Sequence, residues 1–403
     1  MKNTLVLLKN KSVLIILLLF AITNVMAQEK ISLDEDWKFH FGHVANAEKD
    51  FDYSKTALLH KSNVYATTIV HPKFVDSTWQ KINVPHDWLV ELPFVKSEQV
   101  EMDSHGYKPV GGTYPETSIG WYRKHFTVAK SDSGRRFQLQ FDGIFRDASV
   151  WINGFYLGNN KSGYVGVNYD VTDFLNYDRN NVITVRVDAT QYEGWFYEGA
   201  GIYRHVWLNS YPNTHIATDG VFAYANISGN KATLNVETTV ANEYTAAGNY
   251  SINTYLTDRS GVKIGAAKET SIALSTNEEK TIRQIVNVAN PTLWSLDNPY
   301  LYRVVVELKQ NGKVVDSKKL RFGFRTIEIK PNGLFLNGKY IKILGTNNHQ
   351  DHAGVGSALP DYLQYYRIGL LKKFGSNAYR TSHNAPTPEL LDACDSLGML
   401  VMD

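Results

Sequence analysis

A period of two in the apolar residues constrains the fold of this 403-residue chain more than any other feature. From Ile31 to about Tyr211, apolar and polar side chains alternate, as in the run Phe137, Leu139 and Phe141. Successive side chains of a strand point to opposite faces of a sheet, so the alternation predicts half-buried β-strands rather than helices. This part of the chain is therefore expected to form an all-β domain.

Turn residues indicate how these strands connect. Asn153-Gly154 separates the apolar runs at 150–152 and 155–157, and an Asn-Gly pair tolerates the positive φ angles of a two-residue hairpin. Residues 183–187 alternate in the same way and are expected to form another half-buried strand. A meander of such strands predicts a jelly-roll β-sandwich over residues 28–212.

A second all-β segment follows, which we place at residues 213–325. Its strand-like runs Ala232–Val240, Tyr250–Leu256 and Tyr302–Leu308 are separated by Gly, Asn and Asp clusters typical of turns. A size of about 110 residues matches an immunoglobulin-like β-sandwich. Cys394 is the only cysteine, so packing, and not a disulfide within the chain, must hold both sandwiches.

The periodicity changes at about Thr326. Asn337-Gly338 predicts another hairpin, and Tyr340–Leu344 is interpreted as a buried strand. A helix is expected next, with Asp361 as its N-cap and Gly375 as its stop. The apolar residues at helical spacing between them are Leu363, Tyr366, Leu370 and Phe374.

A second strand, helix and strand follow directly. Asn377–Thr381 predicts a strand, Thr387-Pro388 begins a helix that Gly398 ends, and Met399–Met402 predicts a third strand. Strands joined by helical crossovers lie parallel. We interpret residues 326–403 as the first three βα units of an incomplete TIM barrel. The expected fold class is thus mainly β with a C-terminal α/β part.

Residues 1–27 have the pattern of a signal peptide. Lys2, Lys9 and Lys11 precede the apolar run Val13–Ile22, and small residues at Val25–Ala27 suit a cleavage site. This run is shorter than the roughly 20 residues of a spanning helix, and no later stretch approaches that length. We expect an exported protein, periplasmic or extracellular, with no membrane partner.

Charge and spacing exclude other partners. Lys and Arg number 42 against 40 Asp and Glu, and no block of like charge could follow a phosphate backbone, so no nucleic-acid partner is expected. His349, Asp351 and His352 lie close in sequence, but their spacing matches no closed set of metal ligands. No metal and no cofactor are therefore expected.

Several motifs carry a resemblance to a known family. Asn377–His383, followed by Pro388–Met402, resembles the signature of glycoside hydrolase family 2. Further blocks similar to that family occur in the family's order, and the resemblance spans the mature chain from about Trp37 to Asp403. These blocks are Val84–Trp88, Gly120–Lys124, Gly194–Arg204 and Gly345–His352.

The resemblance implies a retaining, exo-acting β-galactosidase-like enzyme whose substrate is a carbohydrate with β-linked galactose. Retaining hydrolysis uses two carboxyl groups about 5–5.5 Å apart, and in this family both are glutamates on later barrel strands. The predicted third strand ends near Asp403, so both glutamates are expected beyond it and no catalytic residue is expected within these residues. The chain is therefore expected to be inactive by itself.

The resemblance also implies residues that support the substrate. His352 and His383 correspond to histidines that contact the sugar, and Arg380 to an arginine that hydrogen-bonds the nucleophile. A guanidinium suits this role because its planar fork matches a carboxylate. The further residues expected from a loop of the first domain at the barrel mouth are Glu193, Trp195 and Glu198.

The sequence leaves several alternative roles open for these residues and for the first domain. His349 could contact the sugar in place of His352, Trp195 could pack between domains, and Arg380 could form a structural ion pair. The jelly roll could also act alone as a non-catalytic carbohydrate-binding module. Within the family, β-glucuronidases and β-mannosidases share the scaffold, and dimers or tetramers are common, so specificity and homo-oligomerisation are both open.

Overall fold

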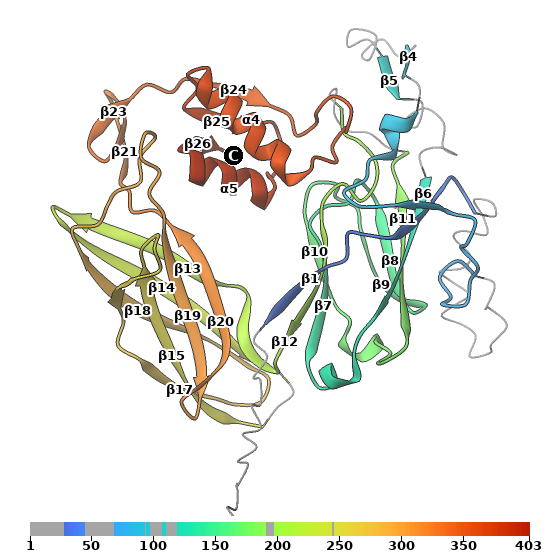
Figure 1. Ribbon diagram of the computed structural model, residues 1–403, viewed down its shortest axis with the longest axis horizontal. Coiled ribbons are helices and arrows are strands. Elements are labelled where there is room, and N and C mark those ends of the chain that lie inside the picture. The colour runs from blue at the N-terminus through green and yellow to red at the C-terminus, as the bar shows by residue number, and fades with distance from the viewer. Residues whose placement is uncertain are drawn as a thin grey trace, which may run out of the picture.

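The computed structural model describes residues 28–44, 68–92, 94–96, 107–109, 119–190, 197–243 and 246–403. The predicted signal peptide lies outside these residues, as do Glu193 and Trp195. Within the described part, no helix combines the length and apolar character needed to cross a membrane. Figure 1 shows two β-sandwiches side by side, with a smaller α/β part above them.

The first sandwich, on the right of Figure 1, packs two sheets against each other. One sheet has the order β1 (Glu29–Ser32), β12 (Val206–Tyr211), β7 (Arg136–Phe141) and β10 (Val167–Asp170). The other has the order β3 (Gln80–Ile82), β2 (Trp37–Phe41), β6 (Ile119–Thr127), β11 (Asn180–Asp188), β8 (Ala148–Ile152) and β9 (Phe155–Asn160). The short elements are β4 (Phe94–Lys96), β5 (Tyr107–Pro109) and 3-10 helices at Trp88–Glu91, Lys130–Asp132 and Thr172–Phe174.

The predicted hairpin between β8 and β9 is confirmed. Asn153 and Gly154 have φ angles of 51° and 88°, and Ile152 pairs with Phe155 across the turn. Both central residues of a type I′ turn need positive φ, which Gly and Asn adopt at least cost.

Strand β11 is buried on both faces, whereas half-burial was predicted. Thr184 and Arg186 of its outer face are almost as inaccessible as the inner-face valines. The outer face is covered by a second apolar cluster that draws on residues 68–79, which are remote in sequence. Its fully buried members are Ile69, Val70, Trp79, Ile119, Trp121 and Trp151.

The second sandwich has the predicted strands at greater length. One sheet contains β13 (Thr214–Ser228), β14 (Lys231–Asn242) and β18 (Glu278–Ala289). The other contains β16 (Lys263–Ala266), β15 (Gly248–Thr257), β19 (Tyr302–Gln310) and β20 (Lys313–Phe322), with β17 (Thr270–Leu274) also pairing with β15. Fully burying each Val, Leu or Ile of its core contributes roughly 1.5–3 kcal/mol, so apolar packing supplies the cohesion that no disulfide provides.

A small antiparallel sheet leads into the α/β part, and here one prediction was wrong. Its strands are β21 (Ile327–Lys330), β22 (Gly333–Leu336) and β23 (Lys339–Ile341), with the predicted hairpin at Asn337-Gly338. Tyr340–Leu344 is therefore not the first barrel strand, which is β24 (Gly345–Asn348). The hairpin uses the start of the apolar run, and Ile343 and Leu344 are exposed.

The α/β part has the predicted parallel topology. Strands β24, β25 (Ala378–Thr381) and β26 (Leu400–Met402) lie side by side and parallel. Helices α4 (Asp361–Lys373) and α5 (Pro388–Leu397) make the crossovers. Its core is small, and its fully buried residues are Ile368, Tyr379, Leu390, Ala393, Cys394 and Met399.

The two helices differ in how well their ends were predicted. Thr387 caps α5 by accepting a hydrogen bond from the Leu390 N–H at 3.2 Å, and Gly398 ends the helix in the left-handed conformation, as predicted. The predicted N-cap of α4 was wrong: Pro360 occupies that position, and Asp361 is already helical. Of the expected apolar face of α4, Leu363 is buried, while Tyr366, Leu370 and Phe374 are exposed.

The second sandwich holds the α/β part through directed hydrogen bonds. The Lys372 ammonium donates to the carbonyls of Leu296 and Gly398, both at 2.6 Å. The Trp294 indole donates to the carbonyl of Asp395 at 2.8 Å. These bonds fix the ends of α4 and α5 against one side of the sandwich.

Candidate active site

The carboxyl ends of the parallel strands bring two of the predicted site residues, Arg380 and His383, to one edge of the sheet, together with His349. Gly345 of β24 pairs with Ala378 of β25, and Ala378 pairs with Leu400 of β26, so the strands end nearly level. Strands β24 and β25 are each followed by a loop at this edge. In barrels of parallel strands, active sites form at this end because several loops converge there.

Arg380 belongs to β25 at this edge, and its side chain reaches β24. Its Nη1 donates to Asn347 Oδ1 at 3.4 Å and to Ser382 Oγ at 3.3 Å. The side chain is half-buried, so these weak, neutral contacts hold the guanidinium without neutralising its charge. A carboxylate placed beside it would gain a charge-assisted hydrogen bond. The proposed role toward a nucleophile stays a prediction.

Histidines from the first two loops approach each other. The rings of His349 and His383 lie 6.0 Å apart, edge to face. Arg367 of α4 fixes the first loop by donating to the carbonyl of His349 at 2.8 Å and to that of Gln350 at 3.2 Å. The structure thus places His349 and His383 in contact at the end of the sheet where Arg380 lies.

His352 belongs to a tight turn further along the first loop. Its N–H donates to the carbonyl of Gly356 at 2.9 Å, and its Nδ1 lies 3.0 Å from the carbonyl of Ala353. The ring is half-buried. The predicted sugar contact of His352 stays a prediction, and His349 stays the alternative.

Glu198 points into the first sandwich. The residue is 6% exposed, and its carboxylate accepts a hydrogen bond from the Tyr164 hydroxyl at 3.1 Å. Its carbonyl accepts from Ser357 Oγ at 3.1 Å, which ties this loop to the α/β part. The sugar contact of Glu198 stays a prediction.

Comparison with known proteins decides the family. The model of the family 2 sugar-binding domain matches residues 31–212, the central family 2 model matches residues 214–325, and the family 2 TIM-barrel model matches residues 327–403. The chain belongs to glycoside hydrolase family 2.

Relatives within family 2 have more than one named activity. The chain is 34% identical to the β-galactosidase BoGH2A of Bacteroides ovatus over 94% of this chain and 41% of the relative. It is 30% identical to a β-glucuronidase of Formosa agariphila over 81% of this chain and 35% of that protein. The chain thus spans less than half the length of these relatives.

Solved structures of family 2 show the same arrangement. A family 2 member from Bacteroides cellulosilyticus superposes with a TM-score of 0.79 at 34% identity, over 93% of this chain and 47% of that one. A β-glucuronidase of family 2 superposes with a TM-score of 0.80 at 26% identity, over 93% of this chain and 39% of that one.

Arg204, in one of the family 2 blocks, joins the first sandwich to both barrel loops. Its Nη2 donates to the carbonyl of Ala385 at 2.7 Å and to Gln350 Oε1 at 3.4 Å. Asn384 donates to the same oxygen at 2.8 Å. The cavity beside these residues has a volume of about 30 Å³, which suits a water molecule and is too small for a sugar. The block is apparent in the sequence, whereas this contact depends on the tertiary structure.

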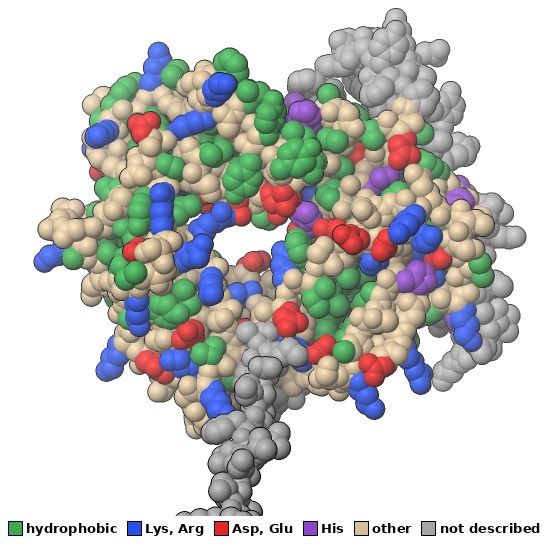
Figure 2. All heavy atoms as spheres, in the orientation of Figure 1, with side chains coloured by type: hydrophobic (Ala, Val, Ile, Leu, Met, Phe, Trp, Pro, Cys, Tyr) green, Lys and Arg blue, Asp and Glu red, His purple; other side chains and the backbone are tan. Residues whose placement is uncertain are grey.

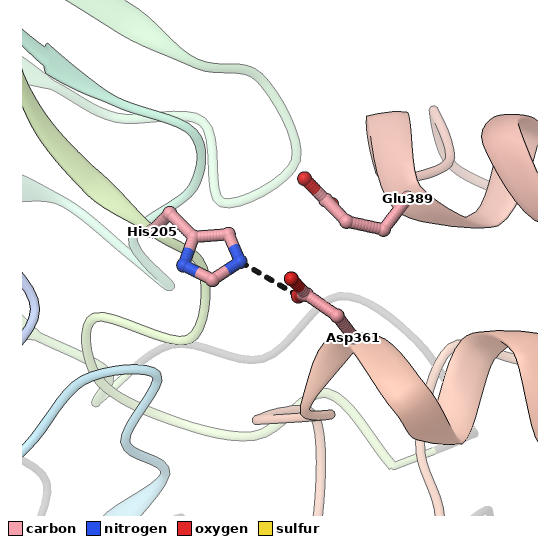
Figure 3. A group of neighbouring side chains, drawn as sticks. All are labelled: His205, Asp361 and Glu389. Atoms are coloured by element: carbon pink, nitrogen blue, oxygen red, sulfur yellow. Dashed lines mark hydrogen bonds and ion pairs between the residues drawn. The ribbon is translucent and has the colours of Figure 1, made fainter. Parts of the chain in front are cut away.

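His205 makes a second contact between the first sandwich and the α/β part (Figure 3). Its Nδ1 lies 2.8 Å from Asp34 Oδ2 and its Nε2 lies 2.8 Å from Asp361 Oδ1. The hydrogen bond to Asp34, with that to Asp361, raises the pKa of His205 to about 9, although burial opposes the rise. The imidazolium is therefore the form that joins the two parts at neutral pH.

The same cluster has the composition of a metal site. His205, Asp361 and Glu389 offer donor atoms within 4.8 Å of one another. A cation there would have to displace the proton on Nε2, and it would lie near the first turns of α4 and α5, where the helix dipoles carry positive partial charge. The ion-paired imidazolium accounts for the geometry without a metal.

This contact predicts a pH dependence. Since folding raises the pKa of His205 from 6.5 to about 9, its contribution to stability is complete below pH 6.5 and is lost as the pH rises through about 9. We expect this contribution to be about 1 kcal/mol, because the solvent exposure of Asp361 weakens the ion pair. In calorimetry, the stability difference between wild type and His205→Gln should shrink from pH 6.5 to 9.5. A constant difference would contradict the assignment.

Proposed function

We propose that the protein containing this chain is a retaining exo-β-glycosidase that acts on β-galactosides. One observation carries the proposal. Arg380, His349 and His383 lie at the carboxyl ends of parallel strands in a family 2 barrel domain. A cationic fork and two imidazoles suit the recognition of a carboxylate and of sugar hydroxyls.

The chemistry assigns distinct tasks to present and later residues. One carboxylic acid protonates the glycosidic oxygen while a carboxylate attacks the anomeric carbon, and water then hydrolyses the glycosyl-enzyme. Both carboxyls are expected on barrel strands after Asp403. Arg380 would keep the nucleophile ionised and oriented, and the histidines would donate to hydroxyls of the bound sugar.

β-Glucuronidase activity is the second candidate. It is favoured by the relatives of Formosa agariphila and by the superposition on a β-glucuronidase of family 2. A non-catalytic carbohydrate-binding role of the first domain is the alternative from another class. The family 2 barrel match at residues 327–403 favours the enzyme.

A panel of nitrophenyl glycosides distinguishes these candidates. We expect the complete protein to hydrolyse the β-galactoside faster than the β-glucuronide and β-mannoside. The purified chain, residues 28–403, should hydrolyse none of them because the reaction needs both carboxyls. Turnover by this chain would overturn the assignment of the glutamates, and a preference for the glucuronide would select the second candidate.

Replacing Arg380 tests the role of the guanidinium. Arg380→Lys in the complete protein should lower kcat about 100-fold, since a point charge cannot hold a carboxylate with two parallel bonds. Arg259→Lys, in an exposed arginine of the second sandwich that donates to the Pro299 carbonyl, is the matched control and should leave kcat unchanged. Equal rates for both variants would exclude Arg380 from the site.

Export is proposed from residues 1–27 alone. Cleavage after Ala27 would leave Gln28 as the first residue of the mature protein. N-terminal sequencing of protein secreted by a bacterial host should find this residue. An N-terminus at Met1 would contradict export.

A further inference from the structure

A buried carboxylate at the junction of three chain segments is not used by the proposed chemistry. Asp87 is 2% exposed. Its Oδ1 accepts from the N–H groups of Leu89 at 3.1 Å and Ala200 at 3.0 Å. Its Oδ2 accepts from the Tyr197 hydroxyl at 2.8 Å and from the Ser357 N–H at 2.9 Å. Asp87 thus joins its own segment to residues 197–200 and to the first barrel loop.

Such a group is costly to bury. Removing a carboxylate from water costs several kcal/mol unless hydrogen bonds replace the lost hydration. Here all four of these donors are neutral N–H or O–H groups, and burial raises the pKa of Asp87 against their effect. An apolar side chain could fill the volume more cheaply, but it could not hold two loops by directed bonds.

Two glycines allow the loops to approach this carboxylate closely. Gly199 and Gly356 have φ angles of +80° and +59°. A Cβ at Gly199 would lie 2.7 Å from Asp87 Oδ2, and one at Gly356 would lie 2.2 Å from it. Only glycine fits at both positions, so the backbones on two sides of Asp87 are shaped around the same oxygen.

The bond to Ser357 fixes the turn that carries His352. The Gly356 N–H donates to the His352 carbonyl at 3.0 Å, and the His352 N–H donates to the Gly356 carbonyl at 2.9 Å. The turn is closed on itself, and Ser357 is the next residue. The Ser357 hydroxyl adds a second tether to the carbonyl of Glu198. Moving Asp87 would therefore move His352 with the turn.

We propose that Asp87 is a positioning residue of the sugar site, which holds the turn of His352 against the first domain without touching the substrate. This inference rests on the proposed glycosidase function. It gives the first domain a part in the activity through a hydrogen-bonded carboxylate rather than through sugar contacts alone.

Asp87→Asn in the complete protein tests the proposal. Asn has nearly the same size as Asp. Its NH₂ group cannot accept the hydrogen bonds that Tyr197 and Ser357 donate to Oδ2, so at least one loop is released. We expect kcat/KM for the β-galactoside to fall 10- to 100-fold, because small displacements of positioning groups have effects of this size. Ser357→Ala, which keeps the backbone N–H and loses only the tether to Glu198, should change kcat/KM less than threefold.

A double-mutant cycle separates positioning from a general loss of stability. If Asp87 acts through His352, adding Asp87→Asn to His352→Ala should lower kcat/KM no further. Additive losses would overturn the proposal. If Asp87→Asn does not fold, Gly356→Ala takes its place, since its Cβ would push the turn away from an intact Asp87.

Hydrogen exchange of the amides of residues 352–357 gives a readout independent of activity. Exchange should be faster in Asp87→Asn than in wild type, and unchanged in helix α5. Faster exchange in a protein without glycosidase activity would support the positioning of the turn while removing the proposed function. Unchanged exchange would overturn the positioning whatever the activity.

Discussion

Three parallel strands and two helices bury too little apolar surface to set their own position, and the α/β part of this chain depends on contacts with both sandwiches. Six residues form its buried core, and β24 and β26 are edge strands within the described residues. Lys372 and Trp294 hold one side. Asp87, Arg204 and His205 hold the other. Directed bonds of this kind fix orientation as well as distance.

Through these contacts the first sandwich both holds the α/β part and supports the loops of the candidate site. Figure 2 shows that the three parts meet around an opening rather than over a continuous interface. Polar contacts near the barrel loops join the first sandwich to the α/β part. They reach the Gln350 side chain and the backbones of Ser357 and Ala385. The candidate sugar site is thus supported by residues some 150 to 270 positions away in sequence.

Features that depend on a few neighbouring residues were predictable. Asn153-Gly154 and Asn337-Gly338 make the expected hairpins because positive φ is a local property. Thr387 caps the start of α5 through its own side chain, and Gly398 ends the helix in the left-handed conformation, so both ends also depend on neighbouring residues alone. The predictions that were wrong concern segments whose neighbours in space are distant in sequence. The first barrel strand is β24 instead of Tyr340–Leu344, and Asp361 binds His205 instead of capping α4.

The sequence by itself determined the strand and helix periodicities, the turns and the family blocks, and through those blocks it placed Arg380 and His383 at the end of a predicted strand. The periodicities and turns follow from backbone preferences and from spacing within one element, whereas the site residues follow from the resemblance to the family. Only the tertiary structure decided that β11 is covered on both faces, that Glu198 faces Tyr164 and that Asp87 joins three segments. A side chain's hydrogen-bond partners depend on which distant backbone comes within 3 Å, and periodicity carries no information about that distance.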